Sequence, residues 1–359
     1  LTAMLHERFR AGGTPVALVS MDNCAGNGKL LRESVLTMAR AWKSGGFVEQ
    51  AFLDWLEREE NVAFDSTMID KITPRPSEEI ARDLENMGIA DMQPVVTGKR
   101  TYIAPFANAE RPQYLVIEDR FPNGRPALEK GFGVYMGDFE TVRKSERMKV
   151  TVCLNPAHTA VGPLGVVLGQ ERFADMLRDL PVTMKMARRV VFDEGMPVVP
   201  DPGILSPKAF ADEVFERFQN LYLGDTNLRL ATDASQGLSV RFGETIKSYV
   251  AKDGTASALV AIPLGIAGFF RYAMGLDDQG KPFELAPDPL TPEIHTALRQ
   301  VKLGCPGSYH GELRPYLSNE SIFGIDLYKA GLGEKIESYF AEMIAGSGSA
   351  LQTIEKYIG

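Results

Sequence analysis

The segment Met148–Thr159 holds an amine, an amide and an imidazole within otherwise mostly apolar sequence. These groups belong to Lys149, Asn155 and His158. A lysine taken partly out of water has its ammonium form destabilised, so it can accept a proton near neutral pH as a general base. An asparagine N–H can donate to an oxygen that gains negative charge. A dehydrogenase of secondary alcohols that uses no metal needs these groups, while a cofactor takes the hydride.

Each of these residues also has a purely structural interpretation. A lysine beside a core strand often extends its amine to solvent, Asn155-Pro156 is typical of a turn or helix start, and a single histidine is commonly structural. Cys153, inside the same segment, is expected to be a small buried hydrophobe rather than a nucleophile. Spacing alone leaves both interpretations open.

The elements around this segment indicate how it would be positioned. The run Val16–Val19 predicts a strand buried on both faces, as in a parallel sheet. A polar turn carrying Asn23 follows, and then apolar residues at helical spacing from Leu31 to Trp42. Sheets built from such strand–turn–helix units bind ligands beyond the carboxyl ends of their strands, which is where Asn23 falls.

After about residue 145 long amphipathic stretches dominate, which predicts a mostly helical second domain. The expected organisation is an α/β domain over 1–145 and an all-α substrate and catalytic domain over 146–359. A Gly-x-Gly-x-x-Gly turn, which would cradle a pyrophosphate, does not occur near the start. We therefore expect either a different kind of domain or a dinucleotide domain whose Gly-rich N-terminal half is missing from this chain.

Composition excludes several classes of function. The 359 residues carry 39 Lys+Arg against 47 Asp+Glu, a net charge of −8 that argues against a nucleic-acid partner. An uninterrupted apolar run of about 18 residues is lacking, so no membrane association is expected. Three widely separated cysteines favour a reducing cytoplasm over a disulfide framework. Four histidines without a Cys-x-x-Cys or His-Glu-x-x-His pattern argue against a metal site.

Several short motifs resemble the polyol-specific long-chain dehydrogenases, the family of mannitol 2-dehydrogenase and the fructuronate and tagaturonate reductases. Met148–Thr159 is similar to the family signature Met-Lys-x-x-x-x-Leu-Asn-Pro-x-His-Thr. Other landmarks follow in family order: Ser20–Asn23 with Asn27-Gly28, Met68–Pro74, Pro105-Phe106, Val116–Asp119, Gly124–Pro126, Arg229–Gln236, Arg271-Tyr272 with Gly275, and Asp288-Pro289. Each motif is weak by itself, whereas their shared order is specific.

The resemblance implies a fold and a set of roles. The fold would be a partial Rossmann-type NAD-binding domain followed by a helical domain similar to the C-terminal domains of 6-phosphogluconate dehydrogenases. Lys149 would be the general base, with Asn23 and Asn155 holding the reacting oxygen. The nicotinamide would lie beside Asn23 and Asp70, and substrate hydroxyls or a carboxylate would be bound by His158 and Arg229.

The sequence departs from the family pattern in two places besides its N-terminus. The family lysine stands five residues before the asparagine, whereas Lys149 precedes Asn155 by six, so a one-residue bulge would be needed to keep the geometry. The family also has a lysine eight residues after the arginine, where this chain has Gly237. Arg241 or another group would have to substitute for that cation, or substrate choice would differ.

The sequence therefore predicts a metal-independent NAD-linked oxidoreductase that interconverts a secondary alcohol and a ketone on an open-chain sugar acid, D-mannonate and D-fructuronate being favoured. Mannitol 2-dehydrogenase activity is the alternative within this class. A non-catalytic sugar-acid-binding relative is the alternative from another class. A phosphorylated polyol is disfavoured, because no cluster of basic residues marks a phosphate pocket. The expected assembly is a monomer or small homo-oligomer, with the site between the two domains.

Overall fold

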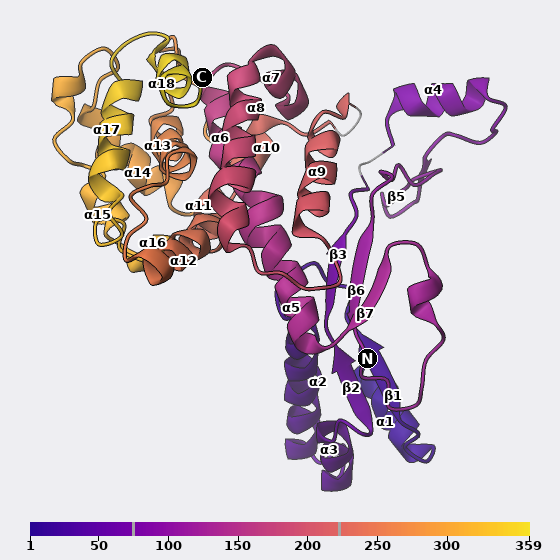
Figure 1. Ribbon diagram of the computed structural model, residues 1–359. Helices are drawn as coiled ribbons and strands as arrows, with labels where there is room; N and C mark the ends of the chain where they lie inside the picture. Colours follow the sequence, from indigo (N-terminus) through magenta and orange to yellow (C-terminus); the bar gives the residue numbers. More distant parts are fainter. Residues whose placement is uncertain (74–75, 222–223) are drawn as a thin grey trace. The chain divides into compact units, whose positions relative to one another are not determined.

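The computed structural model describes residues 1–73, 76–221 and 224–359 and forms two compact units (Figure 1). Unit 1 comprises Leu1–Glu146 and mixes helices with strands, whereas unit 2, Arg147–Gly359, is built from helices. Pro74, the last residue of the Met68–Pro74 motif, lies outside the described residues.

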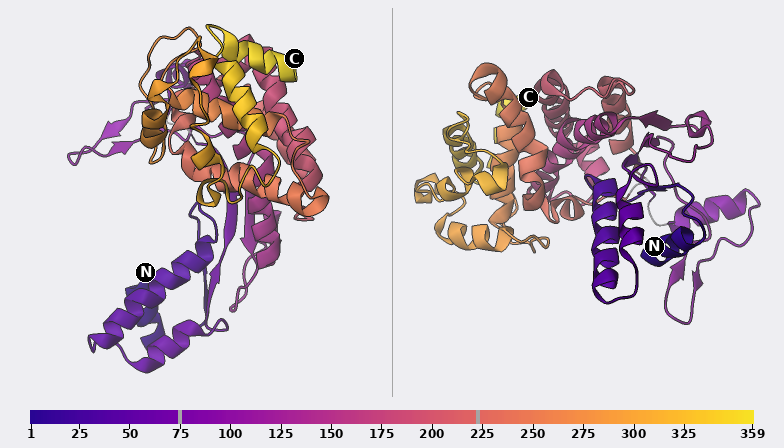
Figure 2. Two further views of the ribbon diagram at one scale, coloured as in Figure 1. Left: turned by 90° about the vertical axis from the view of Figure 1, so that its left-hand side faces the viewer. Right: turned by 90° about the horizontal axis from the view of Figure 1, so that it is seen from below.

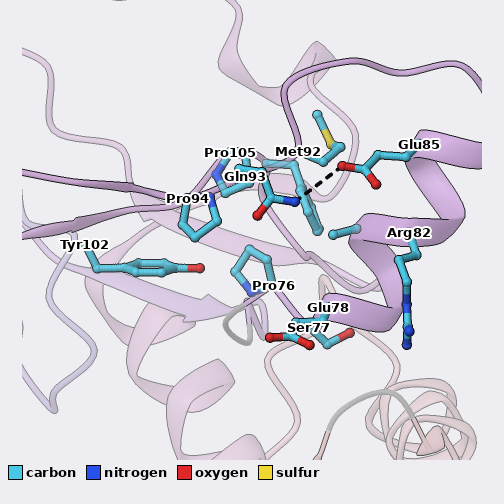
Figure 3. A pocket seen from close by; sticks show the side chains of 12 residues that line it. Pro76, Ser77, Glu78, Arg82, Glu85, Met92, Gln93, Pro94, Tyr102 and Pro105 are labelled. Atoms are coloured by element: carbon cyan, nitrogen blue, oxygen red, sulfur yellow. Dashed lines mark hydrogen bonds between the residues drawn. The ribbon is translucent and has the colours of Figure 1, made fainter.

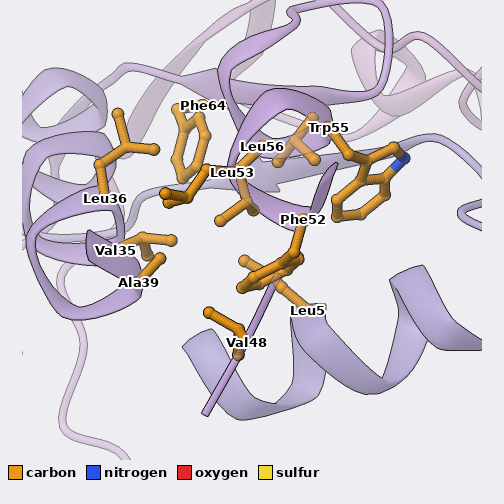
Figure 4. Close-up of a cluster of buried hydrophobic side chains, with 11 residues drawn as sticks. Leu5, Val35, Leu36, Ala39, Val48, Phe52, Leu53, Trp55, Leu56 and Phe64 are labelled. Atoms are coloured by element: carbon orange, nitrogen blue, oxygen red, sulfur yellow. The ribbon is translucent and has the colours of Figure 1, made fainter. Parts of the chain in front are cut away.

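Unit 1 opens with α1 (Thr2–Arg10) and a parallel strand pair. Strand β1 (Val16–Val19) pairs in register with β2 (Val62–Asp65), and α2 (Asn27–Ser44) and α3 (Gln50–Glu57) connect the two strands. Buried apolar side chains from α1, α2, α3 and β2 form one core (Figure 4): Leu5, Val35, Leu36, Phe52, Trp55, Leu56 and Phe64. The strand and helix expected from the apolar pattern are therefore confirmed.

The expectation that β1 is buried on both faces is wrong. All four β1 residues are only partly buried, whereas all four residues of β2 are buried. The physical reason is that β1 pairs with β2 alone in the described part of the chain, so its second edge is open.

A second sheet and the segment inserted between its strands complete unit 1. Strand β3 (Thr67–Asp70) runs antiparallel to β6 (Tyr114–Glu118), which runs parallel to β7 (Val134–Gly137). The elements between β3 and β7 are α4 (Glu78–Asn86), the two-residue strands β4 (Val95–Val96) and β5 (Tyr102–Ile103), and η1 (Leu128–Lys130). Helix α5 (Phe139–Met148) follows and carries the chain into unit 2.

Unit 2 is a succession of helices joined by turns and loops. The elements are η2 (Lys149–Cys153), α6 (Asn155–Val167), α7 (Phe173–Asp179), α8 (Pro181–Arg188), η3 (Arg189–Gly195), η4 (Met196–Val198), α9 (Pro207–Phe218), α10 (Asn227–Ala231), α11 (Ala234–Leu238), η6 (Ser239–Gly243), α12 (Glu244–Asp253), α13 (Ala261–Ala273), α14 (Thr291–Ala297), η7 (Leu298–Gln300), η8 (Pro306–Ser308), α15 (Arg314–Leu317), α16 (Glu320–Phe323), α17 (Gly333–Met343) and α18 (Ser349–Ile358). Three of them, η2, η3 and η6, are π-helical. Residues 344–348 separate α17 from α18, two helices in contact that lie side by side in the left view of Figure 2.

Helices α6 and α13 form the centre of unit 2. Every residue of α13 is buried, and its glycines let it approach α6 closely. A β-carbon on Gly265 would lie 2.9 Å from Ala160, and one on Gly268 would lie 2.5 Å from Leu164. The continuous helical stretch Phe139–Val167 is long and apolar enough to cross a membrane, yet 78% of its most apolar window is buried inside the structure. A core helix passes the same test, so the stretch is explained by the packing of unit 2.

Candidate functional site

Lys149 begins the π-helical turn η2, which joins α5 to α6. The Leu154 N–H donates to the Lys149 carbonyl at 3.0 Å, a bond that spans five residues instead of the four of an α-helix. A π-turn contains one residue more than a regular α-helical turn. Two residues that are six positions apart across a π-turn therefore have the relative orientation of residues five positions apart on a regular α-helix. The Lys149–Asn155 interval thus has a structural explanation. The segment is helical and not the strand considered from the sequence, and Lys149 is only 7% exposed.

Asn155 is the first residue of α6, with Pro156 in the following position where its missing N–H costs nothing. The residue is partly exposed, but its Oδ1 atom is buried and finds no hydrogen-bond donor among the described residues. Buried acceptors are nearly always satisfied in folded proteins, so an orphan oxygen at a helix start is suited to a ligand donor such as a hydroxyl. The Asn155 side chain can therefore accept from a bound group as well as donate.

His158 lies one turn after Asn155 on the same side of α6. Its ring packs edge-on against Phe173, with ring centroids 5.0 Å apart, and lies tilted against Phe218, with centroids 4.6 Å apart. Burial, together with the nearby guanidinium groups of Arg229, Arg241 and Arg217, lowers the pKa of His158 to about 3. The imidazole is therefore neutral at physiological pH, with one nitrogen to donate and one to accept.

Three arginines from three elements thus surround His158. Arg217 on α9 is buried, Arg241 on η6 is half-buried, and the side chain of Arg229 on α10 is 61% exposed. Helix α10 sits close to α6 because glycines face it: a β-carbon on Gly162 or Gly165 would collide with Leu230 or Asn227. This close crossing brings Arg229 to the His158 face.

Sequence reasoning missed Arg217 and considered Arg241 only as a substitute for another cation. A signal for Arg217 was present, because it lies in α9 between Phe215 and Phe218 in an apolar helical pattern. A charge at a core position of such a pattern is uncommon and indicates a special environment.

The two remaining predicted residues belong to unit 1. Asn23 is exposed in the loop after β1, and Asp70 is buried at the end of β3. Asn27, at the start of α2, holds this loop: its Nδ2 donates to the Asp22 carbonyl at 2.7 Å and to the Thr67 carbonyl at 3.1 Å. The Thr67 N–H donates back to Asn27 Oδ1 at 3.0 Å. The Asn-Gly motif is thus a clamp between the loop of Asn23 and the strand that ends at Asp70.

Other chemistry was also considered for the chain. Cys153 is fully buried, as expected, and burial raises the pKa of its thiol to about 12, so it is a poor nucleophile. No three His, Cys, Asp or Glu side chains in the described ranges gather to hold a metal ion.

A hollow of about 510 Å³ lies beside α4 in unit 1, lined by residues such as Arg82, Pro94 and Tyr102 (Figure 3). None of the predicted site residues lines it. The hollow is therefore separate from the Lys149, Asn155 and His158 segment.

Comparison with known proteins matches both units. The family model for the mannitol dehydrogenase Rossmann domain matches residues 1–130, and the model for the mannitol dehydrogenase C-terminal domain matches 141–344. D-mannonate oxidoreductase of Thermotoga maritima is 48% identical over 100% of this chain and 66% of its own length. Mannitol 2-dehydrogenase of Neosartorya fischeri is 30% identical over 100% of this chain and 64% of its own length.

A solved structure shows the same fold. Mannitol 2-dehydrogenase of Pseudomonas fluorescens, in ternary complex with NAD and D-mannitol, is 24% identical with a TM-score of 0.69, covering 99% of this chain and 65% of that one. The chain thus spans about two thirds of the length of these relatives. The predicted order, a Rossmann domain followed by a helical domain, is confirmed.

Proposed function

Because the chain belongs to the mannitol dehydrogenase family, as the Rossmann and C-terminal models together indicate, we propose that it is an NAD-dependent oxidoreductase of an open-chain sugar acid. D-mannonate and D-fructuronate are the proposed pair of substrates. The observation that carries this choice is the neutral His158 among three guanidinium groups, since such a cluster of side chains suits a substrate with both hydroxyls and a carboxylate. The similarity to a D-mannonate oxidoreductase supports the same choice.

The proposed roles follow the chemistry of each side chain. Lys149 removes the hydroxyl proton during oxidation and returns it during reduction. Asn23 and Asn155 hold the reacting oxygen as it gains charge. His158 binds a substrate hydroxyl through its neutral ring, Arg229 binds another hydroxyl or the carboxylate, and Asp70 lines the nicotinamide side. No metal ion takes part in this scheme, in which proton and charge are handled by side chains.

The described residues fit a dinucleotide at one place in unit 1. Helix α2 begins at the carboxyl end of β1, with no side-chain cap and no acidic residue in its first turn. Its open N–H groups and positive dipole end suit a phosphate or another polar cofactor group. Gly28 keeps this helix start tight against β2, because a β-carbon there would lie 2.7 Å from the Phe64 carbonyl. A bound nicotinamide would accept or supply the hydride.

The relatives named as mannitol 2-dehydrogenases favour a second candidate, mannitol and fructose, for the same site. A non-catalytic sugar-acid-binding relative is a third. For all three candidates we propose the cytoplasm as location and a small molecule as partner, with neither nucleic acid nor membrane, in a monomer or small homo-oligomer.

Rates of NADH formation with D-mannonate and with mannitol test the proposal. We expect kcat/KM for mannonate to exceed that for mannitol by more than tenfold. The reverse preference would establish the mannitol enzyme. Saturable binding of mannonate without turnover, and without quenching or enhancement of NADH fluorescence, would instead identify the non-catalytic relative.

A further inference from the structure

Arg241 is a half-buried cation that has no counter-charge within the part of the chain that the structure describes. It lies on the π-helical element η6, and its Nη1 donates to the Thr159 hydroxyl at 2.9 Å. Thr159 follows His158 directly on α6. Across the described ranges no carboxylate pairs with Arg241, and burial lowers the pKa of its guanidinium. The guanidinium nevertheless stays protonated, because arginine is always charged in proteins.

The neighbouring arginines are engaged by other groups. Arg229 pairs with Asp225, Nη2 to Oδ1, at 2.5 Å. Arg217 is buried and has an interaction of its own, although its Nη2 atom finds no hydrogen-bond acceptor among the described residues. Removing a charge from water without pairing it costs free energy, so an unpaired buried cation is uncommon unless a ligand completes it. Arg241 therefore carries a charge for which the described residues supply no carboxylate.

Gly237 makes room for this side chain. A β-carbon at position 237 would lie 2.5 Å from Arg241 Nε and 2.7 Å from Cζ, so any larger residue would displace the guanidinium. Gly237 lies within α11 and its φ is not positive, so the helix backbone itself does not need a glycine there. A glycine in a helix costs about 1 kcal/mol relative to alanine. The geometry therefore explains Gly237 by the space that the Arg241 side chain needs.

We infer that Arg241, whose guanidinium packs over Gly237, binds the substrate carboxylate and so selects sugar acids over neutral polyols. The inference rests on the proposed function and identifies the residue that determines its specificity. With Nη1 held by Thr159, the remaining N–H groups of the guanidinium are available for a bidentate contact with a carboxylate. The neutral His158 beside it would bind a hydroxyl of the same substrate.

The test compares kcat/KM for D-mannonate and mannitol in wild type, Arg241→Gln, Arg241→Lys and Gly237→Ala. We expect Arg241→Gln to lower the mannonate-to-mannitol ratio roughly 50-fold, mainly through KM, because a hydrogen bond to a charged group is lost. Arg241→Lys should lower the ratio less, since lysine keeps the positive charge but cannot make the bidentate contact of a guanidinium. Gly237→Ala should lower the ratio in the same direction although Arg241 is still present.

Arg178→Gln is the matched control, an exposed arginine paired with Asp175 and Asp179 that should leave the ratio unchanged. Circular dichroism of each variant checks that it is folded. A ratio unchanged by Arg241→Gln would overturn the inference, and so would an equal loss for both substrates, because that pattern reports a structural role. A wild type that prefers mannitol would instead refute the proposed function itself.

Discussion

Lys149 is the residue on which the proposed proton transfer depends. It is buried at the start of the π-turn, six positions before an asparagine with an orphan oxygen. We expect Lys149→Ala to lower kcat by about 100-fold or more, the usual contribution of a general base. Steady-state rates measure this, with Lys252→Ala, an exposed lysine on α12, as the control. Activity within twofold of wild type would assign the base to another residue.

Asp65 is a second residue whose surroundings predict a measurable property. It is fully buried at the end of β2, and both carboxylate oxygens lack hydrogen-bond donors among the described residues. Burial, together with the charge of Glu118, raises the pKa of Asp65 from 3.8 to about 7, although Arg120 acts in the opposite direction. The folded state therefore binds more protons than the unfolded state between these values. Stability should fall as the pH rises from about 4 to 7.

Asp65→Asn should remove this pH dependence, because the amide cannot ionise. We expect the free energy of unfolding at pH 8 to rise by up to about 4 kcal/mol, the full effect of the shift, with little change at pH 4. Urea denaturation followed by tryptophan fluorescence measures it, with the exposed Asp54→Asn as control. A variant that is less stable at pH 8 would show that the carboxylate is needed in its charged form.

Most elements with clear apolar periodicity were predictable from sequence, whereas the π-turns were not. The strand at Val16–Val19 and the helices of unit 2 follow hydrophobic spacing, which local sequence determines. The turn η2 depends on the tertiary packing of α5 and α6. In the sequence, its only sign is the one extra residue between Lys149 and Asn155. The greater burial of β2 than of β1 depends on which strands pair. The cluster of arginines around His158 depends on the packing of α9, α10 and η6, which is also a tertiary effect.

The crossing of α10 over α6 is the element-scale feature that positions Arg229. A β-carbon on Gly165 would lie 2.4 Å from the Asn227 side chain, so Gly165→Ala must push the two helices apart. We expect a loss of roughly 1–3 kcal/mol in stability and a rise in KM for the sugar acid greater than the fall in kcat. Thermal denaturation and steady-state kinetics measure these effects. Gly307→Ala, where nothing lies within 4 Å, is the control. Unchanged KM would mean that Arg229 does not contact the substrate.

At the scale of the whole molecule, each unit has its own core and its own spectroscopic signal. Both tryptophans of the chain, Trp42 and Trp55, belong to unit 1 and pack in or against its apolar core. Most helices belong to unit 2, so far-UV circular dichroism is dominated by that unit. Tryptophan fluorescence and circular dichroism can therefore report separately on two units that each bury a complete core.

Glu194 provides the perturbation that separates the two signals. Its buried carboxylate accepts from the Val260, Ala261 and Ile262 N–H groups at 2.7, 2.6 and 2.8 Å, which caps the fully buried helix α13. Glu194→Ala would leave these donors unsatisfied, and we expect a loss of roughly 2–4 kcal/mol confined to unit 2. The urea midpoint by circular dichroism should fall while the tryptophan midpoint stays in place. Glu194→Gln, which keeps an acceptor, should lose less. Equal shifts of both midpoints would show that the two units unfold as one cooperative body, because the tryptophans would then be reporting a change made entirely within unit 2.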